Sequence, residues 1–167
     1  MLFCTIAYWM VGLRVNAGAF FINMGAVIVT CNVAQSMALL VSVGLELQEA
    51  ITLYPVLIMP SMLVGGLYIS VGDIPDYFVW LKYLSFFFYS YMALVINEFD
   101  DTTFSCTESQ LVNGICPVTD GSQVIESYGF NDYSIWIGFL GMILLYCMFR
   151  VLAFVALWIL TKRKSAT

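Results

Sequence analysis

Residues 74–99 read IPDYFVWLKYLSFFFYSYMALVINEF, and this stretch is the most informative part of the chain. It is rich in aromatic side chains, and between Asp76 and Glu98 its only charged residue is Lys82. A soluble domain would not expose so much aromatic surface. The uncharged run after Lys82 is shorter than the roughly 20 apolar residues that a bilayer-spanning helix needs. The stretch therefore indicates a re-entrant or interfacial segment of a membrane protein.

Amphipathic aromatic rings settle at the headgroup level of a bilayer. The stretch carries four such rings that we expect at this level, namely Trp80, Tyr83, Tyr89 and Tyr91. A long apolar run precedes the stretch and an acidic loop follows it.

The whole chain has the composition of a membrane protein. It is 62% hydrophobic and 10% charged, with a mean hydropathy of +0.92, whereas globular domains are nearer half apolar and a quarter charged. Three windows carry no charge, at 15–45, 50–72 and 133–149. The first two are long enough to span a bilayer, and the third becomes so by running past Arg150 to Thr161.

We predict an all-α membrane protein, a polytopic helical bundle with about three full spans, a partial N-terminal span and a re-entrant exoplasmic segment. Residues 1–13 are too short to cross a bilayer as a helix. They suit a signal peptide poorly, because no Lys or Arg precedes the apolar run. A short re-entrant piece is a second interpretation, and we prefer the end of a span that begins earlier. The predicted segments are 1–13, a span at 18–45, a span at 50–70, the re-entrant segment 74–98, an exoplasmic loop 99–132, a last span 133–161 and a tail 162–167.

The charges are unevenly distributed behind a net charge of −5. The segment 99–132 contains acidic residues but no Lys or Arg, whereas residues 162–164 are all basic. Because basic residues concentrate on the cytoplasmic side, we place the C-terminus in the cytoplasm and the acidic loop outside or in a lumen. Arg150 lies about 26 Å of helix below Tyr133, and we expect it to snorkel to the cytoplasmic interface. No basic patch suggests a nucleic-acid partner.

The span predicted at 18–45 carries small residues at four-residue spacing, namely Thr30, Ala34, Ala38 and Ser42. Such a stripe lets two membrane helices approach closely. The same span contains Asn32, Gln35 and Ser36, which should face the bundle interior or a wet cavity, because polar groups facing lipid are costly. Hydrogen bonding between helices is the simpler explanation for these three residues.

The span predicted at 50–70 contains Pro55 and Pro60. A proline removes a backbone hydrogen bond and kinks a helix. In a membrane that defect must be satisfied by protein or water, which favours a helix that lines a cavity. Met59 and Met62 add adaptable apolar surface beside the kink, although methionine also serves as packing.

The five cysteines fall into two environments. Cys4, Cys31 and Cys147 lie in apolar spans, where cysteine behaves as a small buried hydrophobe. Cys106 and Cys116 lie in the acidic loop, which the topology places in an oxidising compartment. A bridge between them would close a short loop and stabilise it by about 3 kcal/mol, unless one of them pairs with a second chain.

Common catalytic patterns are absent from the sequence. It contains no histidine, and no GxxxxGKS/T, GxSxG, HExxH or CxxC pattern occurs. These patterns supply nucleotide-phosphate cradles, nucleophiles and metal ligands. We therefore expect neither enzymatic activity from this chain by itself nor a metal or cofactor bound to it.

Four stretches occur in a characteristic order: AYWMVGL at 7–13, NVAQSMALLVSVG at 32–44, the run from PSMLVGG to INEF at 60–99, and FRVLAFVALW at 149–158. They resemble the ends or bodies of the third to sixth spans of a G-subfamily ATP-binding-cassette half-transporter, of the white or pigment-precursor type. The 60–99 run resembles the fifth span with its exoplasmic gate and re-entrant helices. The likeness covers essentially the whole chain.

This resemblance implies a membrane domain that pairs with a second half, as a homodimer or heterodimer. Each half would be joined to a cytoplasmic domain that binds ATP and Mg and that this chain lacks. The expected substrate is an amphipathic compound such as a lipid or sterol, held between paired copies of the second and fifth spans.

The resemblance also assigns roles by position. The substrate cavity would be lined by Ile58, Met59 and Met62. An apolar plug toward the outside would be formed by Leu67 and Tyr68. Cys106 and Cys116 would match the bridge of the exoplasmic loop, and Glu98 the acidic residue that closes the re-entrant segment.

Some features depart from the family pattern. On this resemblance we expect the ATPase domain, the first two spans and most of the third to lie outside residues 1–167, and Tyr68 puts a hydroxyl in the plug. One alternative is a small multi-span scaffold or regulatory partner without transport of its own, although the outer loop lacks the CCG triplet of tetraspanins. Another is a short, transport-dead product that pairs with full-length subunits.

Overall fold

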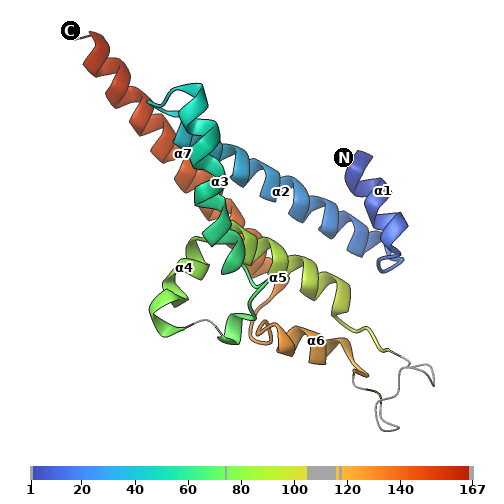
Figure 1. Ribbon diagram of the computed structural model, residues 1–167. Coiled ribbons are helices and arrows are strands. Elements are labelled where there is room, and N and C mark those ends of the chain that lie inside the picture. Colours follow the sequence, from blue (N-terminus) through green and yellow to red (C-terminus); the bar gives the residue numbers. More distant parts are fainter. Residues whose placement is uncertain (1, 74, 105–115, 117, 166–167) are drawn as a thin grey trace.

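The computed structural model describes residues 2–73, 75–104, 116 and 118–165 (Figure 1). Its elements are α1 (Leu2–Val11), α2 (Ala17–Ser42), α3 (Leu47–Leu63), the short 3₁₀ turns η1 (Val71–Asp73) and η2 (Asp76–Phe78), α4 (Val79–Leu84), α5 (Phe86–Phe99), α6 (Gly121–Ser127) and α7 (Ile135–Ser165). Within these residues, extended backbone pairs at a single isolated bridge, between Thr103 and Asp120. The predicted all-α fold class is confirmed.

Two helices are long and apolar enough to cross a membrane. The spans are Ala17–Ser42 in α2, with a hydropathy of 1.8, and Ile135–Arg163 in α7, with a hydropathy of 2.4. Asn16 starts α2, because its side-chain oxygen accepts the N–H of Gly18 at 3.0 Å. Figure 1 shows α2 and α7 converging toward the end of the molecule where α3 begins.

The helix predicted at 50–70 runs instead over Leu47–Leu63, a length of 17 residues. The chain turns at Gly65 and Gly66, and Gly66 has a φ of 87°, which glycine adopts without a steric penalty. The predicted segment 74–98 is likewise divided, because Ser85 separates α4 from α5. The loop predicted at 99–132 contains a further short helix, α6.

The main core lies where α2, α5 and α7 meet. From α7, Met142, Leu145 and Phe149 contribute buried side chains at helical spacing. They pack against Ala26 and Val33 of α2 and against Phe86 of α5. Tertiary contact with two neighbours, rather than helix propensity, therefore orders α5, which is shorter than a span.

Glycines let α7 lie very close to α5. A Cβ atom on Gly138 would come within 2.9 Å of the Tyr89 carbonyl oxygen and 3.0 Å of the Ala93 Cβ. A Cβ atom on Gly141 would overlap the Tyr89 ring. Small residues at such crossings allow the backbone-to-backbone approach that drives helix association in membranes.

A second core lies between α5 and the segment that contains α6, two elements that Figure 1 shows next to each other. Phe88 and Met92 of α5 are fully buried there against Phe130. The four aromatic residues that we expected at the headgroup level therefore separate into two pairs. Trp80 and Tyr83 of α4 are 63% and 51% exposed, whereas Tyr89 and Tyr91 pack against these cores.

We expect Gly141→Ala to lower the thermal stability of the protein in detergent. The new methyl group must displace the Tyr89 ring, and such overpacking costs about 1–3 kcal/mol. The matched control is Gly72→Ala, because a Cβ atom there meets nothing within 4 Å. A melting temperature of Gly141→Ala equal to or above that of wild type would contradict the close packing.

Candidate functional site

The predicted cavity residues lie on α3, whose outer face the described chain leaves uncovered. Met59 is 66% exposed, while Ile58 and Met62 are half-buried. Pro55 and Pro60 both lie inside this helix. Each proline leaves a carbonyl of the preceding turn without its helical donor, so this face combines apolar surface with local hydrogen-bonding capacity.

The predicted plug residues lie on the turn after α3. Gly65 and Gly66 are buried against α5, because a Cβ atom on Gly65 would come within 2.8 Å of the Phe87 Cβ. Leu67 and Tyr68 follow directly and are 44% and 64% exposed. The buried glycines thus hold the backbone while the two following side chains project from the surface.

Ser85 ties this turn region to the re-entrant segment. Its hydroxyl donates to the Ser61 carbonyl at 2.6 Å, a group in the last turn of α3 that lacks a helical partner. The same oxygen accepts the Phe88 N–H at 3.3 Å and caps α5. One buried hydroxyl therefore joins the end of α3 to the start of α5.

The stripe of small residues on α2 faces two different neighbours. Thr30 hydrogen-bonds Ser90 of α5 at 2.7 Å, and the Ala34 carbonyl accepts the Tyr54 hydroxyl of α3 at 3.0 Å. Ala38 and Ser42 line an apolar groove of about 290 Å³ between α2 and α3. The first residue of the stripe thus faces the main core, and the later residues face α3.

Glu98 connects the end of α5 to the turn between α1 and α2. Its Oε1 accepts the backbone N–H of Arg14 at 2.7 Å, and the Arg14 guanidinium donates to the Asp100 carbonyl at 2.6 Å. The hydroxyl of Tyr8, which is 3% exposed, donates to the Arg14 carbonyl at 2.6 Å. The other oxygen of Glu98, Oε2, is buried and has no hydrogen-bond partner among the described residues.

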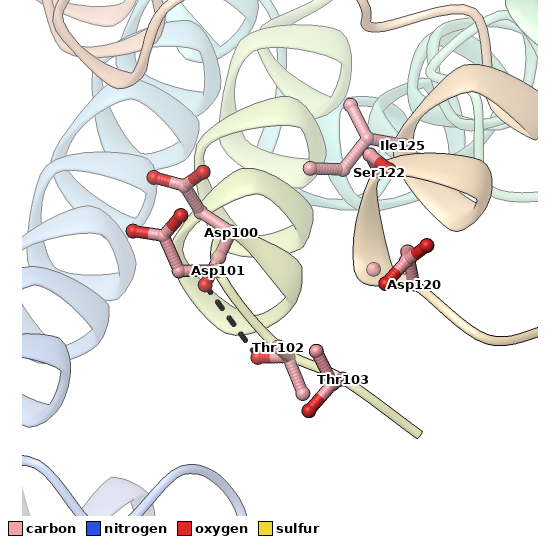
Figure 2. A pocket seen from close by; sticks show the side chains of 8 residues that line it. Asp100, Asp101, Thr102, Thr103, Asp120, Ser122 and Ile125 are labelled. Carbon is pink, nitrogen blue, oxygen red and sulfur yellow. Dashed lines mark hydrogen bonds between the residues drawn. The ribbon is translucent and has the colours of Figure 1, made fainter. Parts of the chain in front are cut away.

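An open cavity of about 350 Å³ lies next to this cluster, at the base of the acidic loop (Figure 2). Figure 2 shows Asp100, Asp101 and Asp120 around it, on the segments that follow α5 and precede α6. Backbone hydrogen bonds from Phe104 to Thr119 and from Gly121 to Thr102, at 2.8 and 2.7 Å, hold its walls together. No group of three or more metal-ligating side chains occurs among the described residues.

The predicted loop bridge falls partly outside this region. Cys116 is described, whereas Cys106 lies outside the described residues, so the bridge stays a prediction. The three cysteines of the apolar helices, Cys4, Cys31 and Cys147, are free thiols. The prediction that they are buried is wrong, because Cys31 and Cys147 lie on exposed faces of their helices and Cys4 is only half-buried.

Sequence reasoning missed two polar connections. The Ser85 link could have been found from its position directly before the apolar run of α5, which is the signal of a helix cap. The role of Arg14 had no local signal, because its partners Glu98 and Asp100 lie 84 and 86 residues away in the chain.

The fold defines the class of protein as a polytopic helical membrane protein. It contains two helices long enough to span a bilayer, a third helix with two prolines, and several short helices. Residues 1–99 match the family model described as ABC-2 type transporter. The chain therefore belongs to this family, as its resemblance to the G-subfamily had indicated.

Curated relatives extend this match over nearly the whole chain. ABC transporter G family member 1 of Dictyostelium discoideum is 34% identical over 98% of the chain. Protein white of Drosophila melanogaster is 34% identical over 99%, and the ATP-binding protein/permease wht-1 of Caenorhabditis elegans is 36% identical over 95%. The chain spans only 21% to 24% of the length of these relatives.

We expect Glu98→Ala to speed hydrogen–deuterium exchange in the segment 12–17. The Arg14 N–H would lose an acceptor, and a hydrogen bond to a charged group contributes about 1.5–3 kcal/mol. Glu98→Gln should keep slow exchange, because its amide oxygen can replace Oε1. The exposed Glu126→Ala serves as a control, and equal exchange in Glu98→Ala and wild type would refute the connection.

Proposed function

We propose that residues 1–167 form part of the membrane domain of an ATP-driven transporter that moves lipids, sterols or other amphipathic compounds. The observation that carries this proposal is the uncovered face of α3 in a chain of the ABC-2 family. ATP hydrolysis would occur in a nucleotide-binding domain outside these residues, where ATP and Mg would bind.

The uncovered face of α3 supports pairing with a second transporter half. Ile51, Val56 and Met59 are 64%, 60% and 66% exposed. In a bilayer such a face can meet lipid, but two prolines on it favour a cavity lined by protein or water. A second half placed against α3 would enclose an apolar chamber beside Ile58, Met59 and Met62, suited to an amphipathic substrate.

A displacement of α3 would be transmitted to α5, on the exoplasmic side, through Ser85. Closure on the cytoplasmic side would narrow the chamber, and α3 would pass the displacement to α5 through the bond from Ser85 to Ser61. The turn that carries Leu67 and Tyr68 lies at this junction. These two side chains would form the plug that opens outward, which is alternating access of a site between two halves.

The test of this function is transport by the complete subunit that contains residues 1–167. It would be reconstituted in proteoliposomes with labelled phospholipid and sterol, with and without ATP. ATP-dependent movement of either probe is expected. If the subunit hydrolyses ATP but moves no amphipathic probe, the proposed transport function is overturned. The membrane-scaffold alternative then remains.

In the same subunit, Leu67→Ala should raise ATP turnover without substrate. Shortening the plug removes apolar contact that keeps the outer end of the chamber closed, so futile cycling increases. Leu144→Ala is a matched control, because Leu144 is a 60% exposed leucine of α7 away from this turn. Unchanged basal turnover in Leu67→Ala would count against the plug.

We also propose that Cys106 and Cys116 form a disulfide bridge in the acidic loop. Thr103 and Asp120 form an antiparallel bridge at the base of this loop. The chain segments that lead to the two cysteines therefore start side by side, which supports the proposed bridge.

Cys106→Ser should make the segment 99–132 more sensitive to protease while the spans stay inserted. A closed loop of this size is stabilised by about 3 kcal/mol through its bridge. Cys31→Ser, which changes a free thiol in α2, is the control. If the loop of Cys106→Ser and that of wild type are cleaved at the same rate, the bridge does not exist.

A further inference from the structure

Arg150 lies well inside the apolar span of α7. The span covers Ile135–Arg163, and about 18 Å of helix separates Arg150 from Lys162 at 1.5 Å per residue. A snorkelling side chain would extend toward Lys162 and the cytoplasm. The Arg150 guanidinium instead lies 5.3 Å from the centre of the Tyr146 ring, one turn in the opposite direction. The Arg150 side chain therefore runs back along α7 toward Tyr146 and not toward Lys162.

Ser36 holds the guanidinium in this orientation. The Arg150 Nε donates to the Ser36 hydroxyl oxygen at 3.1 Å. Ser36 is fully buried in α2, and its own hydroxyl donates to the Asn32 carbonyl at 2.7 Å. The serine oxygen is thus oriented as an acceptor for Nε, which leaves the two terminal nitrogens of Arg150 without a hydrogen bond to any described residue.

No carboxylate of α2, α5 or α7 compensates this charge. Neither α2 nor α7 contains Asp or Glu. The carboxylate of α5, Glu98, bonds Arg14 at the other end of α2, where Asn97 also bonds the Ala19 carbonyl. A charged group at this depth is costly unless it has a partner or a wet cavity, and such residues commonly mark functional sites.

We propose that Arg150 is an intramembrane subsite for the anionic headgroup of an amphipathic molecule, with a phosphate or carboxylate as the recognised group. The inference rests on the proposed transport of amphipathic compounds and names a second contact for them, on α7 rather than α3. A guanidinium whose outer edge is free presents two parallel donors that match the oxygens of a phosphate or carboxylate.

The surroundings suit the apolar part of such a molecule. Ile143 lies two turns from Arg150 on the same side of α7, toward the Ile135 end, and is 48% exposed. Leu140, one turn further along, is 59% exposed. An acyl chain can therefore lie along α7 while the headgroup reaches Arg150. A translocated substrate and a resident lipid share this chemistry.

Native mass spectrometry of the protein in detergent, without ATP, tests the subsite with two probes. Dioleoyl phosphatidate carries the phosphate, and dioleoylglycerol has the same tails without it. We expect Arg150→Gln to weaken phosphatidate binding about tenfold or more, and Arg150→Lys, which loses the planar fork, by a smaller factor. Dioleoylglycerol binding should not change in either variant.

Lys162→Gln is the matched control, because it removes one positive charge from the same helix near its cytoplasmic end. It should change phosphatidate binding by less than about threefold, since an exposed charge at the interface is screened. Ser36→Ala keeps the charge of Arg150 but removes the hydrogen bond that orients its guanidinium. We expect this variant to lose an intermediate part of the phosphatidate affinity. Circular dichroism shows whether each variant keeps its helices.

Equal phosphatidate binding by Arg150→Gln and wild type overturns the subsite, as does an equal loss in Lys162→Gln. Wild-type protein that binds no phosphatidate overturns it too, and points to a protein carboxylate as the partner of Arg150. A substrate is distinguished from a resident lipid by ATP-dependent release of labelled phosphatidate from the reconstituted subunit. Because binding is measured without ATP, loss of transport with intact binding overturns only the proposed function.

Discussion

The position of α5 is the constraint on which the other elements depend. This helix is too short to span a bilayer, so its place is set by contacts with α2 on one side and α7 on the other. Gly138 and Gly141 make room for it on α7, and Ser85 caps its start while holding the end of α3. At its far end, Glu98 and Asn97 bond the turn and first residues of α2. These contacts join α2, α3 and α7 to α5.

This arrangement separates two kinds of surface. The faces of α5, α2 and α7 that meet are closely packed, and Thr30 of α2 hydrogen-bonds Ser90 of α5 between them. The faces of α3 and α4 are covered much less, and they carry Met59, Trp80 and other large apolar side chains at the surface. A closely packed core beside a sparsely covered α3 suits a transporter. A helix that moves during transport must change its contacts while the rest of the bundle stays folded.

Composition and periodicity were sufficient for the all-α membrane fold and for the two long helices. The sequence was less informative wherever tertiary contact overrides local preference. Tyr89 and Tyr91 look like interfacial rings in the sequence, yet residues of α7 and of the α6 segment pack against them. The local sequence contains no signal that predicts those contacts. The span expected to reach Ser70 ends at Leu63, because the glycine pair packs against α5 instead of continuing the helix. The contact of Arg150 with Ser36 had no local signal, because the two residues are 114 positions apart in the chain. The family resemblance, in contrast, depends on ordered stretches of sequence and needed no contact information.

The bonds from Arg14 to Glu98 and from Asn97 to Ala19 join positions 84 and 78 residues apart. During synthesis, α2 is therefore made well before its hydrogen-bonding partners on α5. Until residue 98 has been synthesised, the Arg14 turn has no carboxylate to receive its N–H, and α2 lacks this connection to α5. Assembly of this domain is consequently a late event in translation. A pause or premature stop before residue 98 would leave α2 inserted but unanchored, in a form that the quality-control machinery of the membrane could recognise.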